Sequence, residues 1–172
     1  MLDLLGGILI IGGMTGFGML YLEKERQQME ELRQFSYLFK LLKSEITFKK
    51  QPLPYACRAA GEKIGSEKGS ILIKIAEEMD EGSGRGFSGL WREKWESFLN
   101  TSFLSGQEQH KVIEFSGFVG YEEESMQESV MEHQVEEFSR MAEQKREELE
   151  KKKRVVLLLS SCMGILFVLI LL

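Results

Sequence analysis

Apolar and polar residues fall into blocks along the chain, and the longest apolar blocks stand at its two ends. Residues 4–22 contain no charge, and neither do residues 155–172. A helix needs about 20 apolar residues to cross the hydrocarbon core of a membrane, with a lower limit of about 17. The pattern therefore predicts two transmembrane helices. In the first, Gly12 and Gly16 form a small-residue face that would let another helix pack closely.

Between these blocks, residues 23–154 show apolar positions at helical period, with no convincing two-residue alternation. The first stripe runs from Met29 to Ile46, and Pro52 and Pro54 stop it. Further helices are predicted at 53–64, 67–81 and 87–98, in a segment that begins at a Ser105–Glu108 capping box, and over 122–154. The expected fold class is all-α: two long antiparallel helices continuous with the spans and capped by a small helical bundle.

Charge predicts how this chain is oriented. The basic residues next to the two spans all lie on the side of the central segment; they are Lys24, Arg26, Lys151, Lys152, Lys153 and Arg154. Basic residues near span ends mark the cytoplasmic side of a membrane protein. We therefore expect an N-terminal span in residues 1–22, a cytoplasmic domain in 23–154, a C-terminal span in 155–172, and both termini outside. The cluster Lys151–Arg154 is expected to lie at the membrane surface.

Composition excludes several classes of function. The central segment is mildly acidic, which argues against nonspecific nucleic-acid binding. Its GRGFSG stretch, residues 84–89, has the glycine spacing of a dinucleotide-binding fingerprint. That motif also needs a strand before it, and none is predicted here. The two histidines lack ligand spacing, and the two cysteines are not expected to pair. We expect no metal site, no cofactor, no small-molecule substrate and no enzymatic activity.

Two features leave an interaction role open. Trp91 and Trp95 lie one turn apart, which suits core packing or a partner-binding surface. An acidic run stands at the start of the last soluble helix, where negative charge interacts favourably with the helix dipole or could contact a partner. Its members are Glu122, Glu123, Glu124 and Glu128.

The order of segments over nearly the whole chain resembles the stage III sporulation protein AB family. The resemblance rests on the glycine-rich first span, Glu25-Arg26, Leu32-Arg33, the stretch 44–46, the Pro-Leu-Pro turn at 52–54 and Leu90-Trp91. The chain departs from the family pattern in GFVGYEEES, residues 117–125, and in KKKRVV at the start of the tail.

This resemblance implies a membrane platform in a secretion-like channel between mother cell and forespore, located in the mother-cell membrane around the forespore. The helical domain is similar to that of the type II secretion F platform protein, and would couple a cytoplasmic secretion-type ATPase to other channel proteins. Glu45, Trp91 and the acidic run are the predicted partner contacts. The alternative is a membrane-anchored coiled-coil protein that self-associates through residues 122–154 to tether or organise membranes.

Overall fold

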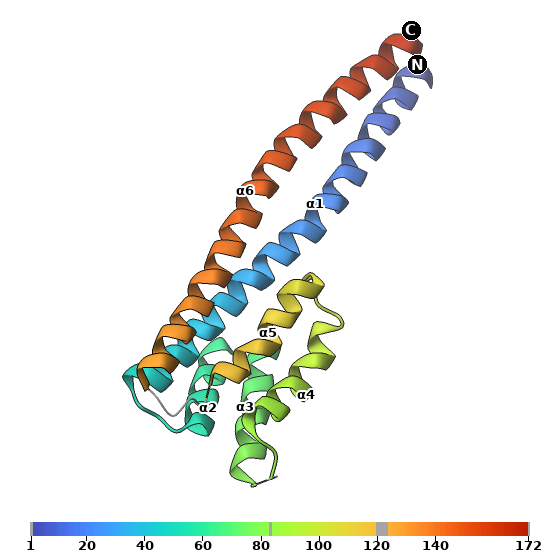
Figure 1. Ribbon diagram of the computed structural model, residues 1–172. Coiled ribbons are helices and arrows are strands. Elements are labelled where there is room, and N and C mark those ends of the chain that lie inside the picture. The colour runs from blue at the N-terminus through green and yellow to red at the C-terminus, as the bar shows by residue number, and fades with distance from the viewer. Residues whose placement is uncertain (1, 83, 120–123, 172) are drawn as a thin grey trace. The chain divides into compact units, whose positions relative to one another are not determined.

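The computed structural model describes residues 2–82, 84–119 and 124–171. Most side chains before residue 22 and after residue 159 lie outside the described residues. The described part is helical and contains no strand, which confirms the all-α prediction (Figure 1). Its elements are α1 (Leu2–Lys43), the π-helical turn η1 (Ser44–Phe48), α2 (Leu53–Ile64), α3 (Glu67–Asp80), α4 (Phe87–Leu99), α5 (Gly106–Phe118) and α6 (Glu124–Leu171).

The chain divides into two compact units. One consists of residues 31–141, called here the helical domain, and the other of residues 1–30 and 142–172, called the helix pair. Helices α2 to α5 lie entirely in the helical domain, together with the later part of α1 and the first part of α6.

Local sequence signals account for most helix ends. Pro52 precedes α2, and Gly65 ends it with a left-handed backbone at φ 61°. The predicted capping box at the start of α5 is confirmed, because the Ser105 hydroxyl accepts from the Glu108 N–H and the Glu108 carboxylate accepts from the Ser105 N–H. The bounds of α2, α3 and α4 agree with the predicted segments within one residue.

The end of the first helix differs from the prediction. We expected a regular helix up to Pro52, but α1 ends at Lys43 and continues as the π-helical turn, in which the Lys49 N–H donates to the Ser44 carbonyl. Lys50 then takes a positive φ of 50°, which is uncommon for a residue other than glycine. The wider turn shifts the register, so that Glu45 is buried and Ile46 only partly so.

Aromatic side chains form the core of the helical domain. Phe39 on α1 stacks on Phe115 of α5 with ring centroids 4.1 Å apart. Phe35 lies 5.1 Å from Trp95, and Phe39 lies 4.9 Å from Phe138 of α6. All five side chains are fully buried, as the sequence stripe of α1 predicts for Phe35 and Phe39. The core therefore joins α1, α4, α5 and α6.

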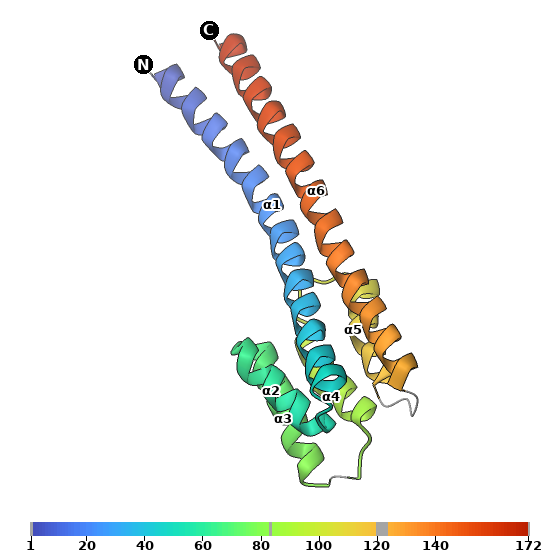
Figure 2. The ribbon, with the colours of Figure 1, turned by 90° about the vertical axis from the view of Figure 1, so that its left-hand side faces the viewer.

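Helices α2 and α3 form a hairpin whose closest approach depends on two glycines (Figure 2). A Cβ atom at Gly61 would lie 2.7 Å from the carbonyl oxygen of Gly69, and a Cβ at Gly69 would clash with the carbonyl of Gly61. Both positions are buried. The backbones of the two helices can pack this closely only because neither residue carries a side chain.

Polar anchors fix the edges of the aromatic core. Lys68 of α3 is buried, donates to the Gln34 side chain at 2.8 Å and lies 4.6 Å from the centroid of the Phe98 ring. Glu31 of α1 accepts from the Phe103 N–H at 3.0 Å, which ties the α4–α5 connection to α1. Desolvation raises the pKa of Glu31, although Lys68 acts in the opposite direction.

In the helix pair, α1 and α6 run antiparallel side by side (Figures 1 and 2). Glu25 of α1 joins them, because its carboxylate lies 2.7 Å from the Lys145 amine and 2.8 Å from the Lys152 amine of α6. Hydrogen bonds from Lys145 and then Lys152 are the main reasons why the pKa of Glu25 is lowered.

Across the part of the chain that the structure describes, no helix offers a stretch long and apolar enough to cross a membrane. The two predicted spans are therefore not confirmed. Most of their side chains lie outside the described residues.

Candidate interaction surfaces

The described residues offer no grouping typical of a metal centre, since no three histidine, cysteine or acidic side chains there converge on one point. Cys57 is buried, and burial raises the pKa of its thiol to about 12, so it is poorly suited to act as a nucleophile. His110 lies 3.1 Å from Glu114 of the same helix and is exposed.

Trp91 lies in the core. Its side chain is 0% exposed, and its indole N–H donates to the Val112 carbonyl at 2.8 Å, which fixes α4 against α5. Trp95 is also fully buried. Of the two roles considered for this pair, the geometry matches core packing, and the role of Trp91 is corrected from surface contact to core residue.

Glu45 is also buried, at 0% exposure. Its carboxylate lies 2.5 Å from the Lys63 amine of α2 and 2.9 Å from the Lys49 amine at the end of η1. Hydrogen bonds from Lys63 and then Lys49 lower the pKa of Glu45, so the carboxylate is ionised at neutral pH. Glu45 cannot itself reach a partner on the surface; it holds two half-exposed lysines at the junction between α1 and α2.

Exposed aromatic and basic side chains precede and follow this junction in the chain, and together they are called here the elbow surface. It comprises Tyr37, Lys40, Phe48, Lys49, Tyr55 and Lys63. Phe48 is 73% exposed, Tyr55 63% and Tyr37 52%. Tyr37 contributes electrostatically to the raised pKa of Lys63, after the larger effect of Glu45, and so lies near it. Exposed aromatic residues beside cations are typical of protein interfaces.

The predicted acidic run is described only in part. Glu122 and Glu123 lie outside the described residues, Glu124 begins α6, and Glu128 is partly exposed. The acidic character continues along the helix, where Glu128, Glu132 and Glu136 are four residues apart and line a shared hollow. These three glutamates are called here the acidic face of α6. Glu132 lies 2.5 Å from the Lys43 amine of α1.

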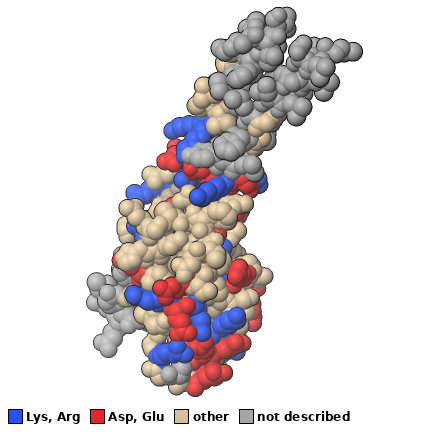
Figure 3. All heavy atoms as spheres, turned by 90° about the vertical axis from the view of Figure 1, so that its right-hand side faces the viewer, with Lys and Arg blue, Asp and Glu red and all other residues tan. Residues whose placement is uncertain are grey.

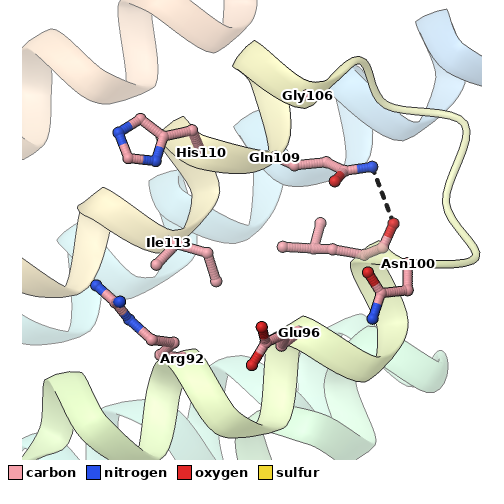
Figure 4. A pocket seen from close by; sticks show the side chains of 8 residues that line it. Arg92, Glu96, Asn100, Gly106, Gln109, His110 and Ile113 are labelled. Carbon is pink, nitrogen blue, oxygen red and sulfur yellow. Dashed lines mark hydrogen bonds between the residues drawn. The ribbon is translucent and has the colours of Figure 1, made fainter.

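A groove of about 280 Å³ lies between α4 and α5 (Figure 4). Arg92 and Glu96 line it from α4, and His110 and Ile113 line it from α5. Gln109 closes one end and donates 3.0 Å hydrogen bonds to the carbonyls of Leu99 and Leu104. Side chains of both charges and the apolar side chains of Leu99 and Ile113 therefore line the same groove.

The sequence model of the stage III sporulation protein AB family matches residues 3–172. The chain belongs to this family. A solved structure of stage III sporulation protein AB shares the fold, with a TM-score of 0.63 and 15% identity, and the match covers 72% of this chain and 96% of that one. No curated protein matches the chain significantly. The resemblance inferred from the sequence is confirmed, and membership of the stage III sporulation protein AB family implies a role in sporulation.

In this member of the stage III sporulation protein AB family, the residues predicted at the membrane are placed only in part. The side-chain surroundings of Gly12 lie outside the described residues, whereas a Cβ atom at Gly16 would meet no described atom within 4 Å. Lys151, Lys153 and Arg154 are exposed, and Lys152 is paired with Glu25. Close packing at the glycines and a membrane-surface role of the basic cluster stay predictions.

Sequence reasoning predicted neither the elbow surface nor the pairing of Glu25 with lysines of α6. The elbow surface had a signal, because Tyr37, Phe48 and Tyr55 fall outside the apolar stripe of α1 and Phe48 is followed by two lysines. Some charges elsewhere in the helical domain compensate each other locally. Figure 3 shows acidic and basic side chains interleaved over one end of the face drawn there. Among the ion pairs of the helical domain, Glu78 pairs with Arg85 and Lys94.

Proposed function

We propose that this protein is a non-enzymatic membrane platform of a sporulation-specific, secretion-like channel between mother cell and forespore. In this proposal the helical domain binds a cytoplasmic secretion-type ATPase, and α1 and α6 connect it to partners in the mother-cell membrane. The family resemblance in the sequence supplies this role, and membership of a sporulation family supports it.

One observation carries the proposal beyond family membership. Helices α1 and α6 each extend without a break from an uncharged end segment into the aromatic core, where Phe35 and Phe39 of α1 and Phe138 of α6 are buried. A side chain anchored in this core therefore belongs to the same helix as a predicted membrane segment. Binding energy from an ATPase on the helical domain could reach the membrane segments through these two helices.

The membrane part of the proposal rests on sequence. Residues 4–22 and 155–172 are uncharged and have the length of spans, and the basic cluster Lys151–Arg154 stands at the border of the second. The proposed location is the mother-cell membrane around the forespore, with the helical domain in the cytoplasm and both termini outside.

Accessibility of a single cysteine tests the topology. Glu81 is exposed at the end of α3, so Glu81→Cys provides a reactive thiol, while Cys162 is replaced by serine. Cys57 can stay, because it is buried and its pKa is raised. Labelling by a membrane-impermeant reagent only after lysis is expected. Labelling in intact cells would place the domain outside and exclude contact with a cytoplasmic ATPase.

Recruitment of the ATPase tests the function itself. The full chain in lipid nanodiscs, mixed with the other channel proteins, is expected to retain the cognate ATPase and to change its hydrolysis rate. Arg92→Glu and Glu96→Arg, which alter the α4–α5 groove without touching the core, show whether this groove is the contact. Absence of binding under all nucleotide conditions would reject ATPase coupling, even with the topology as proposed.

The alternative of a self-associating coiled coil finds less support. Met131 and Phe138, which would supply the apolar seam of α6, are fully buried in the core of the same chain. A coiled coil between copies needs such positions to face the partner helix. We therefore favour the platform over the tether.

A further inference from the structure

The elbow surface combines exposed aromatic rings with an excess of positive charge. Glu45 is the only carboxylate described in contact with Lys49 and Lys63, so two lysines share one negative charge. Lys40 lies one turn after Tyr37, is exposed and has no described ion-pair partner. The surface is therefore cationic, although the whole chain has a net charge of −5.

Exposed aromatic rings of this kind are costly to leave in water. Phe48 belongs to the buried class of side chains in most proteins, and burial of such a ring contributes about 1.5–3 kcal/mol. Tyr and Phe are also enriched at the centres of interfaces. A surface of three exposed rings bordered by lysines therefore fits a partner that carries negative charge.

The acidic face of α6 has the opposite character. Glu128, Glu132 and Glu136 repel one another at four-residue spacing, and Lys43 compensates only Glu132. Neither Glu128 nor Glu136 has an ion-pair partner among the described residues. This face is tied to the same end of α1 as the elbow surface, because Lys43, which pairs with Glu132, directly precedes the π-helical turn that carries Phe48 and Lys49.

We propose that the elbow surface of one copy binds the acidic face of α6 of a second copy of this chain. A two-fold symmetric dimer needs a surface that is complementary to itself, with both parts close together. A cationic and an anionic patch that are both tied to the end of α1 meet this requirement. In the dimer, each elbow surface covers the other copy's Glu128 and Glu136, and a closed pair results.

Charge reversal with complementation tests this pairing. The elbow variant combines Lys40→Glu with Phe48→Glu, and the acidic-face variant combines Glu128→Lys with Glu136→Lys. None of these four side chains has a described hydrogen bond or ion pair, so the fold should persist. The full chain is studied in detergent micelles by sedimentation velocity. Each variant alone is expected to raise the dimer dissociation constant at least about tenfold, a change of about 1.4 kcal/mol.

Mixing the two variants is the decisive step. In a mixed dimer, the reversed elbow surface of one variant faces the reversed acidic face of the other. At the second contact, an unchanged elbow surface faces an unchanged acidic face. A mixed dimer with close to wild-type affinity is expected. As a matched control, Lys74→Glu reverses an exposed charge outside both patches and outside the α4–α5 groove, and should leave the dimer intact. Rising salt should weaken the wild-type dimer, because screening acts within about 10 Å at 0.1 M.

Three outcomes would overturn the proposal: a wild-type chain that stays monomeric at low salt, variants that dimerise like the wild type, or a mixture that does not recover. If the protein is instead a monomer that binds phosphatidylserine vesicles, and Lys40→Glu abolishes this binding, the elbow surface binds lipid and not a second copy. Circular dichroism checks that each variant is folded. The result is independent of ATPase coupling, because no ATPase is present.

Discussion

The helical domain and the helix pair are stabilised by different interactions. In the domain, aromatic rings from four helices pack at centroid distances between 4.1 and 6.4 Å, away from water. In the helix pair, the described link between α1 and α6 is ionic and centres on Glu25. The free energy of unfolding falls steeply when a buried side chain loses volume. Ion pairs near the surface contribute little to it, and their contribution depends on salt and pH. Substitutions in the two units should therefore differ in size and in dependence on conditions.

The largest effect is expected in the aromatic core. Phe39→Ala removes a ring that contacts Phe115 and Phe138, and should lower the free energy of unfolding by about 3–5 kcal/mol. Urea unfolding of the full chain in micelles, followed by circular dichroism, measures it. Phe48→Ala is the matched control, because the same ring is exposed there and its loss should change stability by less than about 0.5 kcal/mol. Equal losses would show that the core is not where the structure places it.

The next effect concerns the contact between α2 and α3. Gly69→Ala places a methyl group against the carbonyl of Gly61, and should cost about 1–3 kcal/mol. Gly89→Ala in α4 should act in the opposite direction and stabilise by up to about 1 kcal/mol, because that site is helical, exposed and open. Opposite signs in thermal melts would support the close approach. Stabilisation by both substitutions would contradict it.

Sequence reasoning succeeded where a local signal decides the structure. The Pro52 and Gly65 boundaries, the Ser105–Glu108 capping box and the aromatic stripe of α1 each follow from residues within one or two turns. The π-helical turn was not predicted, because Ser44–Phe48 has ordinary helical propensity and the turn accompanies tertiary contacts of Glu45.

Candidate contacts were harder to predict than helices. A carboxylate is mostly exposed in proteins, so sequence placed Glu45 on the surface, whereas Lys49 and Lys63 stabilise it inside. Trp91 suited core packing or a partner-binding surface, and only the Val112 carbonyl and the neighbouring rings decide between them. Long-range partners of this kind leave no periodic pattern in the sequence.

An intermediate effect is expected at Glu45, the buried charge of the domain. Glu45→Gln keeps the size of the side chain but removes the charge that Lys63 and Lys49 share, and should cost about 1–2 kcal/mol at pH 7. The lowered pKa of Glu45 means that its stabilisation is fully present above the ordinary carboxyl value of 4.5 and is lost as the pH falls through the lower folded value. Urea unfolding from pH 7 to pH 3 should show the wild-type and variant curves converging. A constant difference would assign the loss to packing.

The smallest effect is expected at Glu25. Glu25→Gln removes the charge between Lys145 and Lys152, and should destabilise the chain by less than about 1 kcal/mol, because the lysine side chains retain access to water. Hydrogen exchange of residues 22–30 should nevertheless speed up at low salt, and the difference should vanish in high salt. The lowered pKa of Glu25 also predicts that its contribution is lost as the pH falls below the ordinary carboxyl value.

Glu143→Gln is the control for Glu25, since Glu143 pairs with Arg146 within α6 and does not join the two helices. Faster exchange in residues 22–30 for Glu25→Gln, but not for Glu143→Gln, would mean that the ionic link holds α1 against α6. If neither variant changes the exchange, contacts other than this link hold the pair. The helix pair and the helical domain would then differ in how their side chains pack, and not in how much they depend on ion pairs.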